Sequence, residues 1–259
     1  MTVVARVQPR AVRAVLKHRR SADKLTADEV KRLRETIKAA LKISDNRGYQ
    51  YYAGWHGVPF EWCWHHHPLF LPWHRAYLYF FELSLQRIDP AVTLPWWDWS
   101  TLDNLPKPFR SGALGSAPIK PFTSVHRPGW PQRTFREPGA TTAVPPLPYR
   151  GLYERALEAP SFTAFNERIT EVHDFVHVWT GGTMSDPAWA AYDPVFWAHH
   201  CMVDRCWRIW QHHHPGALPP AIYLDQPLRP RAITVRQVLD VKQLGYDYAQ
   251  SATTVPGAG

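Results

Sequence analysis

The spacing of apolar residues predicts an amphipathic helix near the start of the chain. Apolar positions recur on one helical face after Thr26-Ala-Asp-Glu29, which has the form of a capping box, and the pattern ends at about Lys42. We interpret this helix as scaffold. An aromatic stretch from Tyr49 to Trp64 follows, and its glycines and proline predict a short helix that breaks into a loop.

Three further helices are predicted where the chain is rich in histidine. From His74 the chain presents an almost wholly apolar helical face, which must be buried. Ser161 is suited to cap a helix that runs to Trp179. Asp193 is suited to cap a last helix, which holds a proline in its first turn and runs to Gln211.

Residues 94–160, between the third and fourth of these helices, are rich in proline, glycine and serine. We expect irregular structure there, with a few short strands, laid over a helical core. Loops of this length in a compact domain are usually functional or wrap around a site. We therefore predict a mainly α fold in a single domain over residues 1–259, with its core at about 20–211 and a C-terminal extension over 212–259.

Composition and charge narrow the choice of partners. The chain has 25 prolines, but 45% of its residues are hydrophobic, so long ordered loops are favoured over disorder. The formal charge of +8 is spread along the chain without a dense basic tract, which favours a solvated basic surface. We expect no nucleic-acid partner, although the charge is compatible with an acidic accessory protein.

The cysteines and the first residues bear on the cellular compartment. Cys63, Cys201 and Cys206 form an odd set, and the last two face different ways on a predicted helix, so we expect no disulfide framework. The first twenty residues hold no apolar run, and no segment is long enough to span a membrane. We expect a cytoplasmic protein, or one exported with a partner, and no membrane association.

Fourteen histidines are a surplus for 259 residues, and their positions suggest a metal site. His173 and His177 are four apart on one face of a predicted helix, as chelation by two imidazoles requires, although such a pair alone is more often structural. The position after the first histidine, where a zinc protease has Glu, is Asp174. Two groups of three imidazoles emerge, and they are His56, His65 and His74, then His173, His177 and His200.

The last predicted helix places a carboxylate one turn after a histidine. His200 and Asp204 are four apart and share one face. Asp204 is then either a ligand or a partner that hydrogen-bonds a ligand, and the spacing does not choose between them. Neutral imidazoles without thiolates suit copper or zinc, so two facing coppers that bind dioxygen and a zinc hydrolase are both open at this point.

These residues lie in two long motifs that resemble the family of tyrosinases, catechol oxidases and molluscan haemocyanins, which hold a coupled binuclear copper site. One motif is matched by His65, Phe70, Trp73, His74, Arg75, Leu78 and Glu82. The other is matched by Asp193, Pro194, Phe196, Trp197, His200 and Asp204. With His173 and His177 before Gly181-Gly182, the resemblance spans about residues 20–211.

The resemblance implies a central four-helix bundle that holds two copper ions. One copper takes His56, His65 and His74, and the other takes His173, His177 and His200. Asp204 would support the site without ligating a metal, and Phe196 would form part of the pocket wall. Cys63 precedes His65 by two residues, the spacing at which fungal tyrosinases and molluscan haemocyanins carry a thioether, so the resemblance implies such a crosslink.

The same resemblance implies a reaction, in which O₂ is used to oxidise ortho-diphenols to quinones and to hydroxylate monophenols. The alternatives are a catechol or ortho-aminophenol oxidase without monophenolase activity and, in a different class, a haemocyanin-like O₂-binding protein. Small phenols are the implied substrates, and a copper-delivering accessory protein is a further candidate partner.

Three positions bear on the choice between these reactions. Asp174 stands where relatives with tyrosinase activity often have Asn or Asp, which helps to deprotonate the phenol. Pro187 implies an open entrance, and Val178 offers no charge to a substrate carboxylate. The family's water-holding glutamate is either Glu167 or Glu171.

Overall fold

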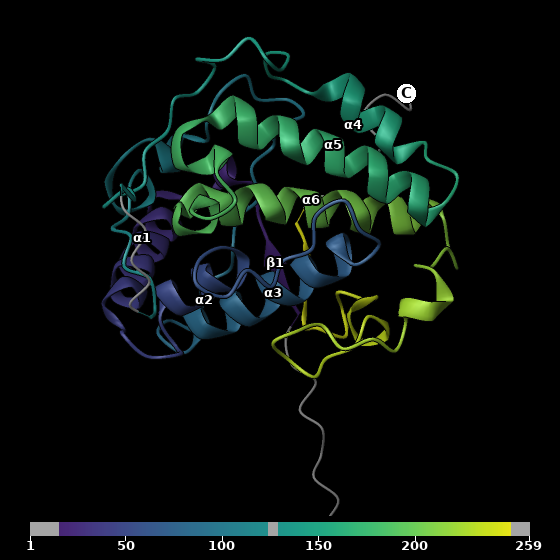
Figure 1. Ribbon diagram of the computed structural model, residues 1–259, viewed down its shortest axis with the longest axis horizontal. Helices are drawn as coiled ribbons and strands as arrows, with labels where there is room; N and C mark the ends of the chain where they lie inside the picture. The colour runs from purple at the N-terminus through teal and green to yellow at the C-terminus, as the bar shows by residue number, and fades with distance from the viewer. Residues whose placement is uncertain (1–15, 124–128, 250–259) are drawn as a thin grey trace, which may run out of the picture.

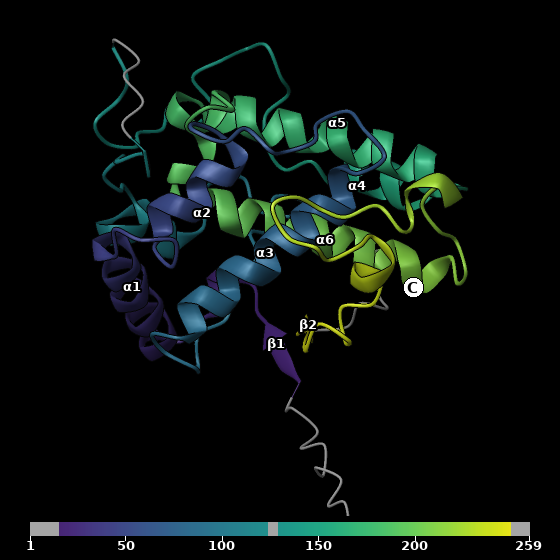
Figure 2. The ribbon, with the colours of Figure 1, turned by 60° about the horizontal axis from the view of Figure 1, so that its bottom comes forward.

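The computed structural model describes residues 16–123 and 129–249, and helices form its core (Figure 1). The described residues contain six α-helices, which are α1 (Ala27–Lys42), α2 (Tyr49–His56), α3 (Phe70–Gln86), α4 (Arg150–Leu157), α5 (Phe162–Thr180) and α6 (Pro194–His213). Two short strands, β1 (Lys17–Arg19) and β2 (Tyr246–Tyr248), pair in parallel (Figure 2). None of the helices in these ranges is long and apolar enough to cross a membrane.

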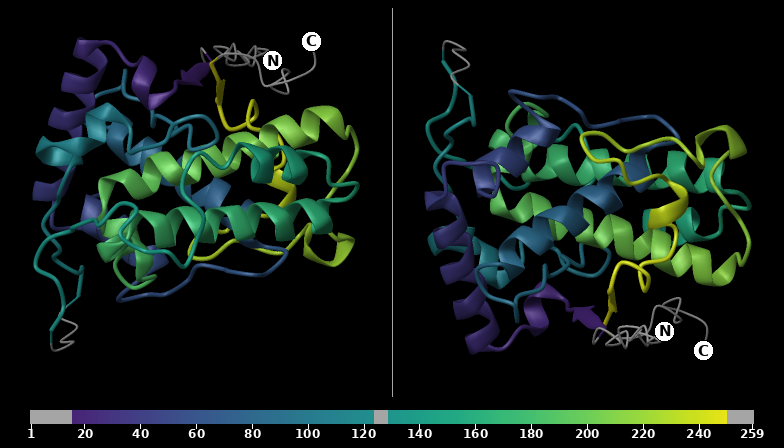
Figure 3. Two further views of the ribbon diagram at one scale, coloured as in Figure 1. Left: turned by 90° about the horizontal axis from the view of Figure 1, so that it is seen from above. Right: turned by 90° about the horizontal axis from the view of Figure 1, so that it is seen from below.

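Helices α2, α3, α5 and α6 form the predicted four-helix core. α6 lies between α5 on one side and α3 on the other, as Figure 1 shows. α1 packs across one end of this arrangement, and the chain after α6 crosses α3 toward β2 (Figure 3). The mainly α fold predicted from the sequence is therefore confirmed.

The predicted helix starts follow from local capping. The Thr26 hydroxyl accepts a hydrogen bond from the Glu29 amide, and the Glu29 carboxylate accepts one from the Thr26 amide at 2.7 Å, which completes the capping box of α1. The Ser161 hydroxyl accepts a hydrogen bond from the Ala164 amide and caps α5, and the Asp193 carboxylate accepts one from the Val195 amide and caps α6. Side chains next to a helix start thus suffice to place three of the six helices.

The start of one helix and the presence of another differ from the sequence-based expectation. α3 begins at Phe70, four residues before His74, with Pro72 in the first turn, where a missing amide hydrogen costs no helical hydrogen bond. α4 was not predicted, and it occupies the end of the long stretch that was expected to be irregular. The consequence for the site is that His74 lies inside a buried helix instead of at its fraying end.

Buried rings fill the space between the core helices. The ring of Trp197 in α6 stacks on Phe81 in α3 with 3.6 Å between centroids, and its indole N–H donates to the Tyr49 hydroxyl in α2 at 2.9 Å. Burial of an indole is favourable when its N–H finds such a partner. One tryptophan therefore ties three of the four core helices together.

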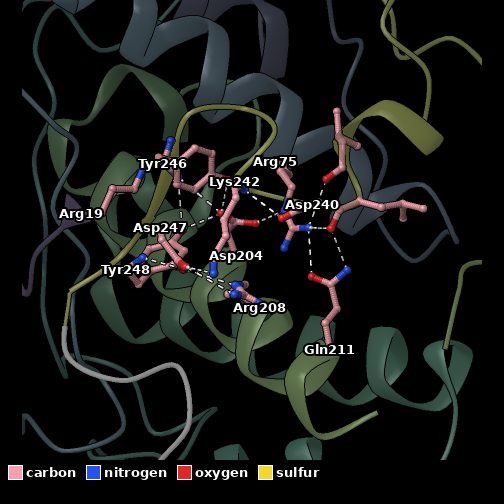
Figure 4. A network of polar contacts seen from close by, with 12 residues as sticks. Arg19, Arg75, Asp204, Arg208, Gln211, Asp240, Lys242, Tyr246, Asp247 and Tyr248 are labelled. Atoms are coloured by element: carbon pink, nitrogen blue, oxygen red, sulfur yellow. Dashed lines mark hydrogen bonds and ion pairs between the residues drawn. The ribbon is translucent and has the colours of Figure 1, made fainter. Parts of the chain in front are cut away.

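A buried polar network joins α6 to both ends of the described chain (Figure 4). Asp204 accepts hydrogen bonds from Arg75 in α3 and from the hydroxyls of Tyr246 and Tyr248, and it lies 3.4 Å from Arg19 in β1. Burial alone would raise the pKa of Asp204, but the two arginines and the two tyrosines lower it below its usual value. Asp204 therefore anchors β1 and β2 on the bundle.

This network shows what Asp204 contacts in the fold. The hydrogen bonds of its carboxylate within the described residues go to arginine and tyrosine, and none goes to an imidazole. Asp204 lies one turn after His200 on α6. At that level of the helix its carboxylate meets Arg75 and the terminal strands. Support of the metal site by Asp204 therefore stays a prediction from the family resemblance, while its observed hydrogen bonds hold β1, β2 and Arg75.

Candidate metal centre

The six histidines predicted as ligands come from five separate segments and converge inside the bundle. They are His56 at the end of α2, His65 in the loop before α3, His74 in α3, His173 and His177 in α5, and His200 in α6. Three overlapping sets have ligand atoms within 4.8 Å of one another, namely His173, His177, His199 and His200; His56, Cys63 and His65; and His56, His74 and His200. The structure thus brings all six predicted ligands together.

The second predicted group is the tighter one. The Nε2 atoms of His173 and His200 are 3.3 Å apart, and those of His177 and His200 are 3.4 Å apart. His173 and His177 share a face of α5 because they are four residues apart, and α6 presents His200 to that face. Three imidazole nitrogens from two helices therefore point at one another.

The first group lies against the second. The Nε2 atoms of His56 and His65 are 3.2 Å apart, and the His74 ring lies 5.7 Å from that of His56 between centroids. The rings of His74 and His200 stack with 4.4 Å between centroids and an interplanar angle of 9°. The two groups are thus in van der Waals contact, as a pair of adjacent metal ions would require.

Backbone and side-chain acceptors fix the orientation of four rings. The Nδ1–H groups of His74, His177 and His56 donate to the carbonyl oxygens of Phe70, Met184 and Pro187 at 2.8, 2.6 and 3.2 Å, and that of His173 donates to Asp174 at 2.9 Å. A donor hydrogen at Nδ1 leaves the lone pair at Nε2, where it faces the other rings. The acceptors therefore select the tautomer that a metal requires.

The protonation state also fits a metal. Burial lowers the pKa of His177 and of His65 to about 4, and it lowers the pKa of His74 and His200 well below 6.5. All four are therefore neutral at pH 7 and offer lone pairs. The buried His74 Nε2 has no hydrogen-bond partner among the described residues, and a bound metal ion would satisfy it. The donor set of neutral imidazoles suits copper or zinc.

His199 lies beside the predicted ligands. Its ring stacks on His173 with 5.1 Å between centroids, and neither of its buried nitrogens has a partner in the described structure. Distance alone does not separate His199 from His200, which faces His74 as well as α5. The preference for His200 as the ligand thus stays a prediction from the family resemblance.

One cavity of about 330 Å³ opens onto the histidines, and we call it the histidine pocket. Its lining combines four of the predicted ligands with the three positions expected to govern the reaction. These residues are His56, His65, His173, His177, Asp174, Val178 and Pro187, with His66, Met184 and Ser185. A larger hollow of about 730 Å³ lies between α1 and residues 113–122, with Arg133, and has no histidine in its described lining.

Phe196 does not line the histidine pocket, contrary to the prediction. Its ring is fully buried and lies 4.1 Å from the ring of His200 and 4.8 Å from that of His56. Because it is one turn before His200 on α6, it packs behind both imidazoles and holds them from the core side. Its contribution is to ligand position.

Asp174 connects a predicted ligand to the rim of the pocket. One carboxylate oxygen accepts the Nδ1–H of His173, and the other lies 3.2 Å from Nε2 of His66. Burial raises the pKa of Asp174, His66 opposes this rise, and Glu171 adds to it. Neither Glu171 nor Glu167 lines the histidine pocket, so neither position is supported for a water-holding glutamate.

The end of α2 is held by a close approach of two loops. A Cβ on Gly57 would lie 2.2 Å from the Ala188 oxygen, and the Val58 amide donates to that same oxygen at 3.2 Å. The preceding residue, His56, bonds the Pro187 carbonyl. The absence of a side chain at Gly57 therefore allows residues 187–188 to orient a predicted ligand.

Cys63 lies between two predicted ligands. Its Sγ is 2.9 Å from the His56 carbonyl oxygen and 3.7 Å from Nδ1 of His65. Burial raises the pKa of Cys63 to about 12, so it is a thiol at neutral pH. Its position beside the imidazole is compatible with the implied crosslink.

Known proteins are similar to this chain in the sequence and the fold that form this group of histidines. A family model described as the common central domain of tyrosinase matches residues 46–150 and 120–213. The chain is 32% identical over 241 residues to a tyrosinase of Streptomyces glaucescens, which covers 78% of this chain and 86% of the relative. It is also similar to the structure of a functional unit of Octopus haemocyanin, with a TM-score of 0.78 and 27% identity over 90% of this chain and 68% of that one.

A further solved structure matches nearly the whole fold. It is a copper-bound mutant of Aspergillus oryzae active tyrosinase complexed with L-tyrosine, with a TM-score of 0.75, covering 94% of this chain and 95% of that one. At 17% identity this match shows the shared fold alone.

Proposed function

Because the chain belongs to the tyrosinase family of copper-dependent oxidoreductases, we propose that it uses two copper ions and dioxygen to oxidise ortho-diphenols to ortho-quinones. The observation that carries this proposal is the convergence of six neutral imidazoles, in two adjoining groups of three, on one open pocket. We further propose that small phenols are the substrates and that the enzyme also hydroxylates monophenols.

The residues of the pocket have separate tasks in this proposal. His56, His65 and His74 hold one copper, and His173, His177 and His200 hold the other. Copper bound there supplies the activation of dioxygen and the exchange of electrons with the phenol. Phe196 fixes the position of two ligands from behind, and the mouth lined by Val178 and Pro187 admits the ring of the substrate.

Asp174 is our candidate for the group that accepts the phenol proton. It is the one carboxylate among the described lining residues of the histidine pocket, and its second oxygen faces His66 at the rim. Hydroxylation of a monophenol requires a base beside the substrate hydroxyl, and oxidation of the somewhat more acidic ortho-diphenol depends on such a base less. Asp174 therefore bears on monophenolase activity in particular.

An oxygen carrier is the competing function, since a haemocyanin unit shares this fold. The histidine pocket favours an enzyme, because its described lining contains no phenylalanine, tyrosine or tryptophan that closes it to a substrate. Turnover decides between the two functions, because a carrier binds O₂ reversibly and leaves catechols unoxidised.

The test is copper content together with turnover of tyrosine, a catechol and an ortho-aminophenol, measured side by side on the copper-loaded protein. We expect two copper ions per chain and oxidation of all three substrates. Oxidation of the catechol with no reaction of tyrosine contradicts the hydroxylase part. Reversible O₂ binding without any turnover contradicts the enzyme, and zinc without copper contradicts both.

The Asp174→Asn variant separates the two activities. Asn keeps an oxygen that accepts the Nδ1–H of His173 but does not take up a proton, so the ligand stays oriented. We expect copper content and catechol oxidation to persist while tyrosine hydroxylation falls about 100-fold. Equal loss of both activities assigns Asp174 to ligand support alone.

A further inference from the structure

A second, smaller cleft adjoins the histidine pocket along α5, and we call it the α5 cleft. It has a volume of about 160 Å³, and its polar lining residues are His66, His67, Thr163, Asn166, Glu167 and Thr170. His66 belongs to the walls of both cavities. The imidazole ring of His66 therefore separates a molecule in the histidine pocket from the α5 cleft.

The two cavities carry negative charge on the same helix. Asp174 lines the histidine pocket and Glu167 lines the α5 cleft, and the exposed Glu171 lies between them on α5. Seven residues of helix separate Asp174 from Glu167, which is about 10 Å along the axis. Among the described residues, no lysine or arginine lines either cavity, although the chain as a whole carries a charge of +8.

A buried acceptor in the α5 cleft has no partner. Asn166 is 5% exposed and donates its Nδ2–H to the carbonyl oxygen of His67 at 3.1 Å, but its Oδ1 accepts no hydrogen bond in the described structure. A buried acceptor without a donor is costly. An N–H donor bound in this cleft would satisfy it.

His66, whose ring lies between the two cavities, has an uncommon backbone conformation. His66 has a φ of +49°, in the left-handed region that residues with a Cβ rarely adopt, and its Nε2 contacts the Asp174 carboxylate at 3.2 Å. Such conformations persist where the surroundings enforce them, and they are concentrated at binding sites. The side chain of His66 therefore lies between the histidine pocket and the α5 cleft, where a substrate that extends from one into the other would pass it.

We propose that the α5 cleft binds the cationic end of a phenolic substrate whose ring occupies the histidine pocket. The ammonium group donates to Asn166 Oδ1 and is attracted by Glu167, while Asp174 favours the passage of positive charge across His66. The substrate class is a phenol with an aminoalkyl ring substituent that is long enough to pass His66 and reach Glu167, whose position on α5 is about 10 Å along the helix axis from that of Asp174. This assignment rests on the proposed phenol oxidation.

The kinetic test compares catechols that differ in the charge at the end of their substituent. The set is methylcatechol, dihydroxyphenylacetic acid, the amide of that acid with putrescine, whose free end is an ammonium group, and the N-acetylated form of this amide, which is neutral. We expect kcat/KM for the putrescine amide to exceed that for its N-acetylated, neutral form about five-fold at low salt, and added salt to reduce this ratio.

Charge substitutions at Glu167 identify the cleft. We expect Glu167→Gln to lower the ratio of kcat/KM for the putrescine amide to that for methylcatechol about three-fold, and Glu167→Lys to lower it further while improving the carboxylate substrate. The matched control is Glu35→Gln, which removes the same charge from the exposed face of α1. If the effect of Glu167 is confined to the α5 cleft, Glu35→Gln leaves the ratio of the two kcat/KM values unchanged.

A binding measurement keeps the inference independent of turnover. The phenylacetyl amide of putrescine has no hydroxyl to oxidise, and its Kd is measurable by calorimetry on the wild-type protein and on Glu167→Gln. A Kd that rises about three-fold in the variant supports binding of the ammonium group in the α5 cleft, whether or not any catechol is oxidised. Failure to oxidise any catechol overturns only the proposed function. Equal Kd values, or oxidation of all catechols without regard to charge, overturn the inference.

Discussion

Nε2 of His173 in α5 and Nε2 of His200 in α6 lie 3.3 Å apart inside the bundle. One shared proton could explain the approach of two neutral imidazole nitrogens. It does not explain the third nitrogen, Nε2 of His177, which lies 3.4 Å from the same Nε2 of His200. Because the His173 and His177 rings are oriented through their Nδ1–H groups, their facing nitrogens carry lone pairs. This convergence is the arrangement of a metal ligand set.

Replacing His200 by alanine should remove the metal bound by this group. We expect copper analysis of the purified His200→Ala variant to fall from two ions per chain to one, with loss of catechol oxidation. The first group keeps its own three imidazoles and therefore keeps its copper.

The adjacent His199→Ala variant is the matched control. His199 is equally buried, and its removal leaves a cavity between Trp97, Trp99 and His173, which costs about 2–5 kcal/mol of unfolding free energy. We expect a lower Tm with both copper ions retained. One copper in this variant and two in His200→Ala would exchange the assignments of the two histidines.

The stability of the copper-free protein should fall in mild acid. Burial lowers the pKa of His177 and His65 from 6.5 to about 4. As pH falls from 6.5 to 4, the unfolded chain binds protons that the folded chain does not, so the free energy of unfolding decreases. The expected loss is on the order of 3 kcal/mol for His177, measured by urea unfolding at several pH values.

The His177→Phe variant checks the origin of that slope. Phenylalanine keeps a buried ring without a titrating nitrogen, so the pH dependence of unfolding should become shallower while folding persists. An unchanged slope would assign the pH dependence to other groups.

Local rules were enough for much of the fold. The caps at Thr26, Ser161 and Asp193 act within three residues of the chain, and the predicted helix starts are confirmed there. The start of α3 was expected at His74 and lies at Phe70, because the first helical turn tolerates Pro72. Helix α4 was missed within a stretch whose overall composition favours loops.

The site was predictable where helix geometry alone brings residues together. His173 and His177 are neighbours on α5 whatever the rest of the chain does. The partners of Asp204 were not predictable, because Arg19 is 185 residues away in the sequence and no spacing rule relates them. The α5 cleft was missed for the same reason, since Asn166 meets His67 across 99 residues.

The Asp204→Asn variant should show that the polar network supports the fold. Asparagine keeps the shape but leaves Arg75 buried without its anionic partner, which costs about 3–5 kcal/mol of unfolding free energy at pH 7. Because the pKa of Asp204 is lowered in the fold, this stabilisation is present above the ordinary carboxyl pKa and is lost as pH falls through the folded value. The wild type and the variant should therefore converge in stability at low pH.

An exposed aspartate provides the comparison. Asp225 pairs with Arg236 at the surface, with 76% and 55% of the side chains exposed, so Asp225→Asn should leave the free energy of unfolding nearly unchanged. Similar losses in Asp204→Asn and Asp225→Asn would contradict the importance of the buried network.

Thiol titration in denaturant should reveal the implied crosslink. The chain has three cysteines, Cys63, Cys201 and Cys206, so protein prepared without copper should show three reactive thiols. Joining the Cys63 sulfur to a ring carbon of His65 removes the thiol hydrogen and a ring hydrogen, with dioxygen as the oxidant. We expect two thiols after copper loading in air and a mass lower by two hydrogens. Three thiols in active enzyme exclude the bond.

Gly57→Ala should weaken the site without touching a ligand. The added Cβ would meet the Ala188 oxygen at 2.2 Å and the Pro187 oxygen at 2.8 Å, so the loop that orients His56 must move away. We expect a loss of about 1–3 kcal/mol in stability from this overpacking and a weaker copper affinity at the first group. The control is Gly151→Ala in α4, where the nearest atom is 3.7 Å away on a flexible arginine and alanine favours the helix. Unchanged copper affinity in Gly57→Ala would show that the Pro187 carbonyl does not position His56.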